Sequence, residues 1–384
     1  MSKNWQAERA DALAAVRAVV VKVGSAVLTR KTEAGMELDL DVLRDLAAQL
    51  AALQARGLRV VLVSSGAVAA GRTALGRTAG PEGLPERQAA AAVGQGRLMR
   101  YYEEAFAAHQ VLTAQVLLTR DDLRDRQRFL NARNTFTQLL DWGVVPIVNE
   151  NDTVSVNELK FSDNDNLASL LLNAVEADIF INLTSIGGVL DKNPLEHADA
   201  RIMPCIDSVR ALDLDALCGG KTAVGTGGMY TKLLAARRAA QLGVPTLILP
   251  GREPGVILAA LACGDLGTWV RPGSRISRRK YWLAYRMEPK GVVHIDAGAA
   301  EAVARKGGSL LPGGVTAVEG DFRNGDPVRV MSGETVVGVG LSNYDTATLA
   351  RIKGLKRHEV AVILGNAHYP EVIHRDNLLL DAAV

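Results

Sequence analysis

Continuous apolar runs, each followed by small or polar residues, recur along the first part of the chain. In Ala18–Val23 only Lys22 interrupts the apolar run before Gly24. A second run, residues 59–63, is followed by Ser64-Ser65-Gly66. Unbroken apolarity, rather than alternation, is typical of strands that helices cover on both faces. We therefore expect two buried strands here.

Helical spacing appears between these two runs. Four leucines recur at intervals of three or four residues before Gly57, which predicts a helix ending at that glycine: Leu43, Leu46, Leu50 and Leu53. Alternating strands and helices indicate an α/β fold with a mainly parallel sheet, in which ligands bind at the carboxyl ends of the strands. Further strands are expected near residues 111–118, 144–148, 178–183 and 245–249.

The pattern changes after about residue 265. A basic stretch is followed by short β-like runs between glycines, at 292–295, 328–331 and 336–339. This second pattern predicts a small, mainly β domain behind the larger α/β domain. The expected organisation is a large domain at 1–265, a basic linker at 266–290, a small domain at 291–370 and a C-terminal tail at 371–384.

Composition and charge restrict the class of protein. With 384 residues, 48% of them hydrophobic and 22% charged, the chain should fold into two domains. Its net charge of +2 gives no reason to expect nucleic acid or an anionic membrane as the main partner. Three cysteines without a CxxC pair favour a reducing compartment. The N-terminus does not resemble a secretory signal, and we expect a cytoplasmic protein.

Two glycine-rich stretches resemble nucleotide-binding motifs without completing them. Gly219-Gly220-Lys221-Thr222 ends like a P-loop, but Asp215 stands where the leading glycine is required. The stretch 225–228 does not complete GxGxxG, because Tyr230 occupies the last glycine position. We therefore expect neither a P-loop nor a dinucleotide fingerprint.

Two lysines are candidates for binding phosphate. Lys22 lies near the end of a buried strand, where its charge is costly unless an anion meets it, either a carboxylate of the protein or a ligand phosphate. The segment 225–232, GTGGMYTK, is a glycine turn that leads into a helix with Lys232 in its opening turn. Helix N-termini bind anions, although an ordinary capped helix is the alternative here.

Two segments rich in Asn and Asp follow the strand expected at 144–148. They are NENDT at 149–153 and SDNDN at 162–166. Either segment alone is most simply a turn. Together they offer acceptors for an ammonium group and donors for a carboxylate, which is what an amino-acid substrate requires.

Seven segments, in this order and spacing, resemble the glutamate 5-kinase family within the amino acid kinases. They are VVVKVGSAVLT (19–29), VVLVSSGAVAAGR (60–72), AAVGQGRLM (91–99), LLTRDDLRDRQRFLNARNTF (117–136), VVPIVNENDTV (144–154), SDNDNLA (162–168) and GTGGMYTK (225–232). Residues 298–330 resemble the PUA domain that many bacterial members carry. This appendage separates the family from acetylglutamate kinase, aspartokinase and uridylate kinase. The resemblance implies an αβα sandwich followed by a small, mainly β PUA-like domain.

The resemblance also implies a role for particular residues. Lys22 and Lys232 match the catalytic lysines on the ATP phosphates, and Asp165 matches the aspartate that holds them. The substrate-binding positions are Ser65, Gly66, Asp152 and Asn164. The ATP-binding positions, besides the lysines, are Gly24, Thr184, Ser185, Thr226, Gly227, Gly228, Met229, Tyr230 and Thr231. The chain departs from the family pattern at Ser185 and Leu190, which concerns adenine and ribose recognition.

The implied reaction is phosphorylation of the γ-carboxylate of L-glutamate by ATP with Mg²⁺, yielding L-glutamyl 5-phosphate for proline biosynthesis. A carboxyl group with a pKa of about 4.3 is ionised at pH 7, so the acceptor needs no general base. The resemblance further implies a homo-oligomer (dimer or tetramer), feedback inhibition by proline, and handover of the product to glutamyl phosphate reductase.

Two alternatives remain open at this point. One is a different small-molecule kinase with the same fold, acting on another carboxylate, a carbamate or a phosphate. The other is an RNA-binding role for the C-terminal domain. Residues 291–384 contain nine Lys and Arg against eleven Asp and Glu, which is a weak electrostatic footprint for RNA.

Overall fold

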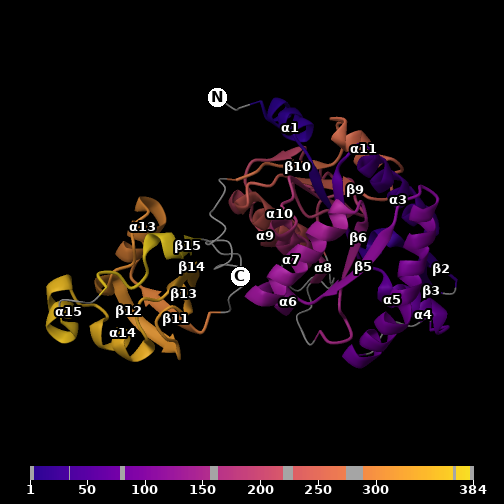
Figure 1. Cartoon of the computed structure of the whole chain (residues 1–384). Helices are drawn as coiled ribbons and strands as arrows, with labels where there is room; N and C mark the ends of the chain where they lie inside the picture. Colours follow the sequence, from indigo (N-terminus) through magenta and orange to yellow (C-terminus); the bar gives the residue numbers. More distant parts are fainter. Residues whose placement is uncertain are drawn as a thin grey trace. The chain divides into compact units, whose positions relative to one another are not determined.

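The structure is a computed structural model that describes residues 4–33, 35–77, 83–155, 163–218, 228–273, 289–365 and 369–380. The chain divides into two compact units, Met1–Arg275 and Ile276–Val384. Each unit has its own sheet and its own buried apolar core (Figure 1).

An eight-stranded sheet forms the centre of the first unit, with the strand order β5-β6-β4-β1-β7-β9-β10-β8. The strands from β5 to β9 in this order are parallel, and β10 runs antiparallel to β9. This confirms the predicted mainly parallel α/β fold. The strands are β1 (Ala18–Val23), β4 (Arg59–Ser64), β5 (Thr113–Leu118), β6 (Val145–Glu150), β7 (Ile179–Thr184), β8 (Cys205–Ile206), β9 (Thr246–Pro250) and β10 (Thr268–Val270). A separate hairpin pairs β2 (Thr29–Thr32) with β3 (Gly35–Leu38).

Helices cover both faces of this sheet. In Figure 1, α3 and α5 lie on one side of the sheet and α7, α8 and α10 on the other. All six residues of β1 are buried, as its nearly unbroken apolar run predicts.

No helix among the described residues is long and apolar enough to span a membrane. The helices are α1 (Trp5–Ala14), α2 (Ser25–Leu28), α3 (Leu40–Ala55), α4 (Ala67–Ala74), α5 (Leu84–Ala107), α6 (Arg120–Arg124), α7 (Arg126–Asp141), α8 (Asp163–Ala174), α9 (Leu214–Cys218), α10 (Met229–Gln241) and α11 (Val256–Leu261).

Helices α4 and α5 cross at a pair of glycines. A Cβ atom on Gly71 would lie 1.8 Å from the carbonyl oxygen of Ala90, and one on Gly94 would lie 1.9 Å from that of Ala67. Only glycine allows two backbones to approach this closely. The crossing therefore holds α4 in place directly behind β4, where the connecting Gly66 has a φ of 114°.

The second unit contains a five-stranded sheet with the order β12-β11-β13-β14-β15. Strands β11 and β13 are parallel and the other neighbours are antiparallel. This agrees with the small, mainly β C-terminal domain expected from the sequence. The elements are β11 (Gly291–Ile295), α13 (Ala297–Lys306), β12 (Val315–Gly320), β13 (Pro327–Ser332), β14 (Thr335–Leu341), α14 (Thr346–Ile352), α15 (Arg357–Leu364) and β15 (Leu378–Leu380).

Two of the expected boundaries differ from the structure. Strand β10, expected to be part of a linker, pairs with β9 in the large sheet, and its Trp269 is fully buried. Strand β15, expected to be part of a tail, pairs with β14. Each strand has three residues, too few to produce a periodic pattern, and tertiary pairing rather than local sequence places it in a sheet.

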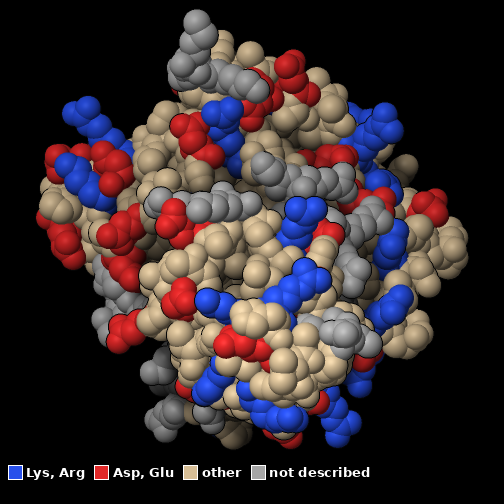
Figure 2. All heavy atoms as spheres, turned by 90° about the vertical axis from the view of Figure 1, so that its left-hand side faces the viewer, with Lys and Arg blue, Asp and Glu red and all other residues tan. Residues whose placement is uncertain are grey.

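Charged side chains of both signs occur on the molecular face shown in Figure 2. Among the described residues of this face, the acidic side chains are more frequent on the left of the view and the basic ones toward the lower right. This mixture agrees with the small net charge of the chain, +2.

Candidate active site

A pocket opens at the carboxyl ends of four adjacent strands, β6, β4, β1 and β7. It has a volume of about 730 Å³ and is lined by residues that follow each of these strands. The carboxyl edge of a mainly parallel sheet is where such proteins place their ligands. The volume is in the range of sites for small molecules and cofactors.

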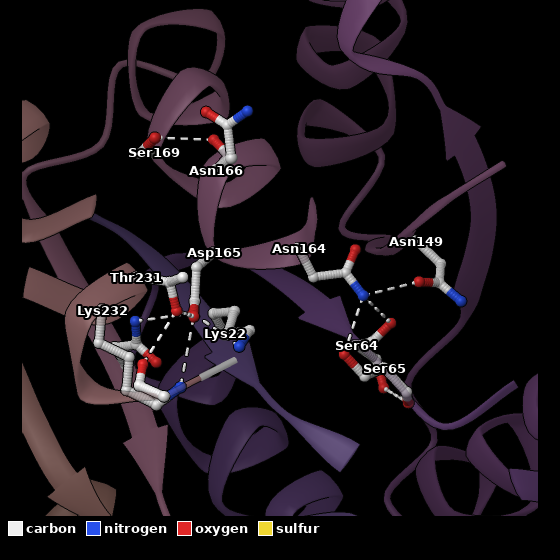
Figure 3. Close-up of polar contacts among 12 residues, drawn as sticks. Lys22, Ser64, Ser65, Asn149, Asn164, Asp165, Asn166, Ser169, Thr231 and Lys232 are labelled. Carbon is white, nitrogen blue, oxygen red and sulfur yellow. Dashed lines mark hydrogen bonds and ion pairs between the residues drawn. The ribbon is translucent and has the colours of Figure 1, made fainter. Parts of the chain in front are cut away.

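Two lysines and one aspartate form a buried cluster at one side of this pocket (Figure 3). Lys22 comes from β1, Asp165 from the first turn of α8 and Lys232 from α10. The Nζ atom of Lys22 lies 2.6 Å from Oδ1 of Asp165, and that of Lys232 lies 3.3 Å from Oδ2. Both lysines line the pocket, whereas Asp165 lies beneath them and is 1% exposed.

Two further side chains hold the Asp165 carboxylate. The hydroxyl of Thr231 donates a hydrogen bond to Oδ2 at 2.7 Å, and the Nδ2 group of Asn182 donates one to Oδ1 at 3.1 Å. Asp165 thus accepts from four side chains on β1, β7 and α10. A carboxylate held on all sides cannot rotate freely, so it fixes the positions of both ammonium groups.

Burial and charge act in opposite directions in this cluster. Burial alone would raise the pKa of Asp165, but the positive charges of Lys22 and Lys232 outweigh it and hold that pKa far below its usual value. Burial lowers the pKa of Lys22 to about 8, although the charge of Asp165 opposes this change. Lys22 therefore loses its proton at a much lower pH than an exposed lysine would.

A second polar cluster lies on the other side of the pocket. The Nδ2 group of Asn164 donates to Oγ of Ser65 and to Oδ1 of Asn149, each at 2.9 Å. Its Oδ1 atom accepts from the backbone N–H of Glu150 at 3.2 Å. Asp152 also lines this side. Desolvation raises the pKa of Asp152, and the nearby Arg87 partly opposes that change.

The first turn of α8 supplies both clusters. Successive residues of an α-helix point about 100° apart around its axis, because one turn takes 3.6 residues. Asp165 therefore faces the lysines, while the preceding Asn164 faces Ser65 and Asn149, as Figure 3 shows. Asn166 points in a third direction, where its side chain accepts a hydrogen bond from Arg238. The Asx-rich segment that was expected to form a turn is thus the first turn of α8, and this turn contributes one side chain to each of the two clusters.

The structure brings most of the predicted site residues together. Tyr230 does not line the pocket, Asp165 and Thr231 lie beneath its surface, and Thr226 and Gly227 lie outside the described residues. The predicted residues that line the pocket are Lys22, Gly24, Ser65, Gly66, Asp152, Asn164, Thr184, Ser185, Gly228, Met229 and Lys232.

Sequence reasoning did not single out several residues of this site. Arg72, Arg87 and Gln88 line the pocket from α4 and α5. Asn182 contacts Asp165 from the middle of β7. Only Asn182 leaves a clear signal, because it is polar within an otherwise apolar buried strand. The remaining residues lie on helices, and which of their side chains face the pocket depends on how those helices pack.

No group of three or more His, Cys, Asp or Glu side chains within the described ranges is arranged to hold a metal ion. Asp165, the carboxylate beneath the two lysines, is paired with them instead.

The chain is an α/β protein with a mainly parallel αβα sandwich, and the paired lysines and the polar subsite at its strand ends suit a phosphorylated ligand next to a small polar one. The amino acid kinase family matches residues 17–250, and the PUA domain matches residues 291–364. The chain belongs to the amino acid kinase family.

Curated relatives match nearly the whole chain. Glutamate 5-kinase of Nitratidesulfovibrio vulgaris is 65% identical over 99% of this chain and 100% of its own length. Glutamate 5-kinase of Oleidesulfovibrio alaskensis is 60% identical over the same shares. Among solved structures, isopentenyl phosphate kinase matches 66% of this chain and 99% of its own at 22% identity, with a TM-score of 0.46.

Proposed function

We propose that the protein transfers the γ-phosphoryl group of ATP to the γ-carboxylate of L-glutamate, the first step of proline biosynthesis. The observation that carries this proposal is the pairing of two clusters in one pocket. A buried Lys–Asp–Lys cluster suits phosphates, and an Asx-rich cluster beside it suits an amino acid. The similarity to glutamate 5-kinases over the full chain supports the same assignment.

The lysine side of the pocket would hold ATP. Lys22 and Lys232 would contact its phosphates, with Asp165 keeping both ammonium groups in place. Backbone N–H groups at Gly24 and Gly66 would supply further donors, as glycine turns at helix N-termini commonly do. The rest of the nucleotide would lie along Thr184, Ser185, Gly228 and Met229, all of which line the pocket. Thr226, Gly227, Tyr230 and Thr231 remain part of this proposed nucleotide-binding set.

Mg²⁺ would enter with the nucleotide. This ion prefers oxygen ligands and usually keeps several waters while it binds substrate phosphates. The pocket offers a carboxylate at Glu150, and the phosphate oxygens themselves are the main ligands of Mg²⁺ in such sites. Bound there, Mg²⁺ would neutralise phosphate charge.

The Asx-rich side would hold glutamate. The carboxylate of Asp152 would accept from the α-ammonium group of the substrate. The Asn164 carboxamide and the Ser65 hydroxyl, already 2.9 Å apart, would fix the position of the substrate next to Gly66.

In the proposed reaction, an oxygen of the γ-carboxylate attacks the γ-phosphorus of ATP. A P–O bond forms to the acceptor, the bond to the β–γ bridging oxygen breaks, and ADP leaves with its electron pair. The acceptor is already ionised, so the protein's task is to bring two anions together and neutralise their charge. Lys22 and Lys232, on strand and helix rather than on loops, are placed to do this.

The test is ADP release from ATP and Mg²⁺ with L-glutamate, N-acetylglutamate or aspartate, each with hydroxylamine present. Hydroxylamine converts an acyl phosphate to a coloured hydroxamate. We expect ADP release and hydroxamate with glutamate only. Turnover with another acceptor, but not with glutamate, would favour the other small-molecule kinases of this fold.

Other parts of the proposal follow from family resemblance. They are a homo-oligomeric state, feedback inhibition by proline, handover to glutamyl phosphate reductase and a cytoplasmic location, the last supported by three free cysteines. An RNA-binding role for the second unit is the alternative. A salt-dependent gel shift with bulk tRNA would test it, because binding through phosphate contacts weakens steeply with salt.

A further inference from the structure

Arg72 is an arginine of the pocket wall, and two nitrogens of its guanidinium group have no hydrogen-bond partner among the described residues. It lies on α4 and lines the pocket. Its Nε and Nη2 atoms are buried and have no hydrogen-bond partner in the part of the chain that the structure describes. A guanidinium group carries five N–H donors and stays charged at any physiological pH. Buried donors of this kind are costly unless something accepts from them.

The other cations of the pocket wall each face a carboxylate. Lys22 and Lys232 contact Asp165. Arg87 is close enough to Asp152 to lower the pKa of that carboxyl group. Arg72 differs from these three cations, because no carboxylate among the described residues pairs with its guanidinium group. An anion supplied by a ligand would complete it, once the side chain turns these buried nitrogens toward the pocket that it lines.

The position of Arg72 is fixed by backbone packing. The preceding residue, Gly71, is at the close crossing with α5, where any side chain would meet the carbonyl of Ala90. Helix α4 begins directly after Ser65 and Gly66, which belong to the proposed glutamate subsite. Arg72 therefore rises from the same short helix that begins at this subsite, about 8 Å further along the axis at 1.5 Å per residue.

We propose that Arg72 binds the α-carboxylate of the amino-acid acceptor and thereby selects α-amino acids. This inference rests on the proposed function and adds the group that recognises the non-reacting end of glutamate. The planar guanidinium offers two parallel N–H donors, which match the two oxygens of a carboxylate. Asp152 would take the α-ammonium group, so the two opposite charges of the substrate would each meet a partner.

The experiment compares L-glutamate with L-isoglutamine, in which an amide replaces the α-carboxylate while the γ-carboxylate and the α-ammonium group remain. Steady-state kcat/KM is measured for both at saturating ATP, in the wild type and in Arg72→Gln and Arg72→Lys. The control is Arg77→Gln, which removes an exposed arginine just beyond the same helix whose contact is an ion pair with Glu86. Thermal unfolding shows whether each variant is folded. The KM for ATP shows whether the nucleotide side of the pocket is unchanged.

We expect the wild type to prefer glutamate by on the order of 100-fold, because a charged hydrogen-bonding group would otherwise stay unpaired. Arg72→Gln should lower kcat/KM for glutamate by a similar factor while changing that for isoglutamine by less than about threefold. Arg72→Lys should keep part of the preference, since it keeps the charge but loses the planar fork. Arg77→Gln should leave both values unchanged.

Equal losses for both substrates in Arg72→Gln, or no loss for either, would overturn the assignment. If Arg72→Gln fails to fold, Arg72→Lys decides, because the assignment requires it to lose activity selectively with glutamate. A wild type that releases no ADP with glutamate would instead overturn the proposed function itself. These outcomes separate the role of Arg72 from the identity of the reaction.

Discussion

At the scale of single residues, the candidate site depends on one buried carboxylate. Asp165 accepts from Lys22, Lys232, Thr231 and Asn182, which come from three different elements. A charge buried without partners would be strongly destabilising, but here both lysines contact the one carboxylate, and the cluster keeps a net positive charge. The cluster therefore keeps two ammonium groups at the wall of the pocket, where phosphate charge would gather.

Lys232→Ala should reduce kcat far more than it weakens glutamate binding. Loss of one positive charge at the transferring phosphoryl group should lower kcat by on the order of 100-fold or more. The KM for glutamate should change by less than about threefold, because the lysine lies on the other side of the pocket from the Asx-rich cluster. Steady-state kinetics would check this, with Lys192→Ala, a surface lysine paired with Asp199, as the control. Equal losses in kcat and in glutamate binding would contradict the proposed role.

The kcat/KM for ATP should decrease above about pH 8. The pKa of Lys22 is lowered to about 8 by burial, so its charge is present below that pH and is lost as the pH rises through it. Without the charge of Lys22, the ATP phosphates lose a partner, so kcat/KM for ATP should decrease by up to about tenfold per pH unit. Lys22→Arg should move this alkaline limb to higher pH even if its overall activity is lower, since arginine stays charged. An identical limb in both proteins would assign it to another group.

At the scale of elements, two helices determine the shape of the acceptor side. Helix α8 points Asn164 and Asp165 into different clusters, and α4, which begins after Ser65 and Gly66, carries Arg72 to the wall of the same pocket. Both helices begin at the carboxyl edge of the sheet. The close crossing of α4 with α5 is what holds α4 in this position.

Gly71→Ala should destabilise the first unit and reduce activity. The added methyl group would lie 1.8 Å from the carbonyl oxygen of Ala90, so the two helices must separate. A cost of about 1–3 kcal/mol, or more, is typical of such overpacking. Urea unfolding with parallel kinetics would check this.

Gly96→Ala is the matched control for that experiment. This glycine lies in α5, and nothing comes within 4 Å of the added methyl group. Replacing an exposed helical glycine by alanine should stabilise the helix by about 0.5–1 kcal/mol. If both variants had the same effect, the close crossing would not explain the result of Gly71→Ala.

At the scale of the whole molecule, the proposed chemistry belongs to one unit. The described residues that line the pocket all lie between Lys22 and Lys232, and the second unit has a separate core that includes Phe322 and Val330. Stability and activity should therefore respond to different parts of the chain.

Phe322→Ala should destabilise the second unit without changing kinase activity. The ring is 1% exposed, and removing a buried phenylalanine typically costs about 3–5 kcal/mol. Calorimetry should show a lower unfolding temperature for one of two transitions, with kcat/KM for glutamate within about twofold of the wild type. Val362→Ala, at a position 87% exposed, should leave both transitions unchanged. A matched fall in activity would show that the kinase pocket depends on the second unit.

The sequence by itself determined the architecture and much of the site. Strands such as β1 and β4 are almost wholly apolar runs, and the small or polar residues just after them line the pocket. These local patterns require no knowledge of long-range contacts. They were sufficient to predict the parallel sheet and to single out both lysines and the Asx-rich segments, although the second of these segments begins a helix and is not a loop.

Only the tertiary structure decided which residues meet. Strand β10 became part of the large sheet because β9 and β8 were available to pair with it, not because of its own three residues. Asn182 contacts Asp165, and Arg72 lines the pocket, only because tertiary packing brings distant parts of the chain together. A side chain's direction on a helix or strand is local, but its partner depends on how distant elements pack, and no local pattern encodes that.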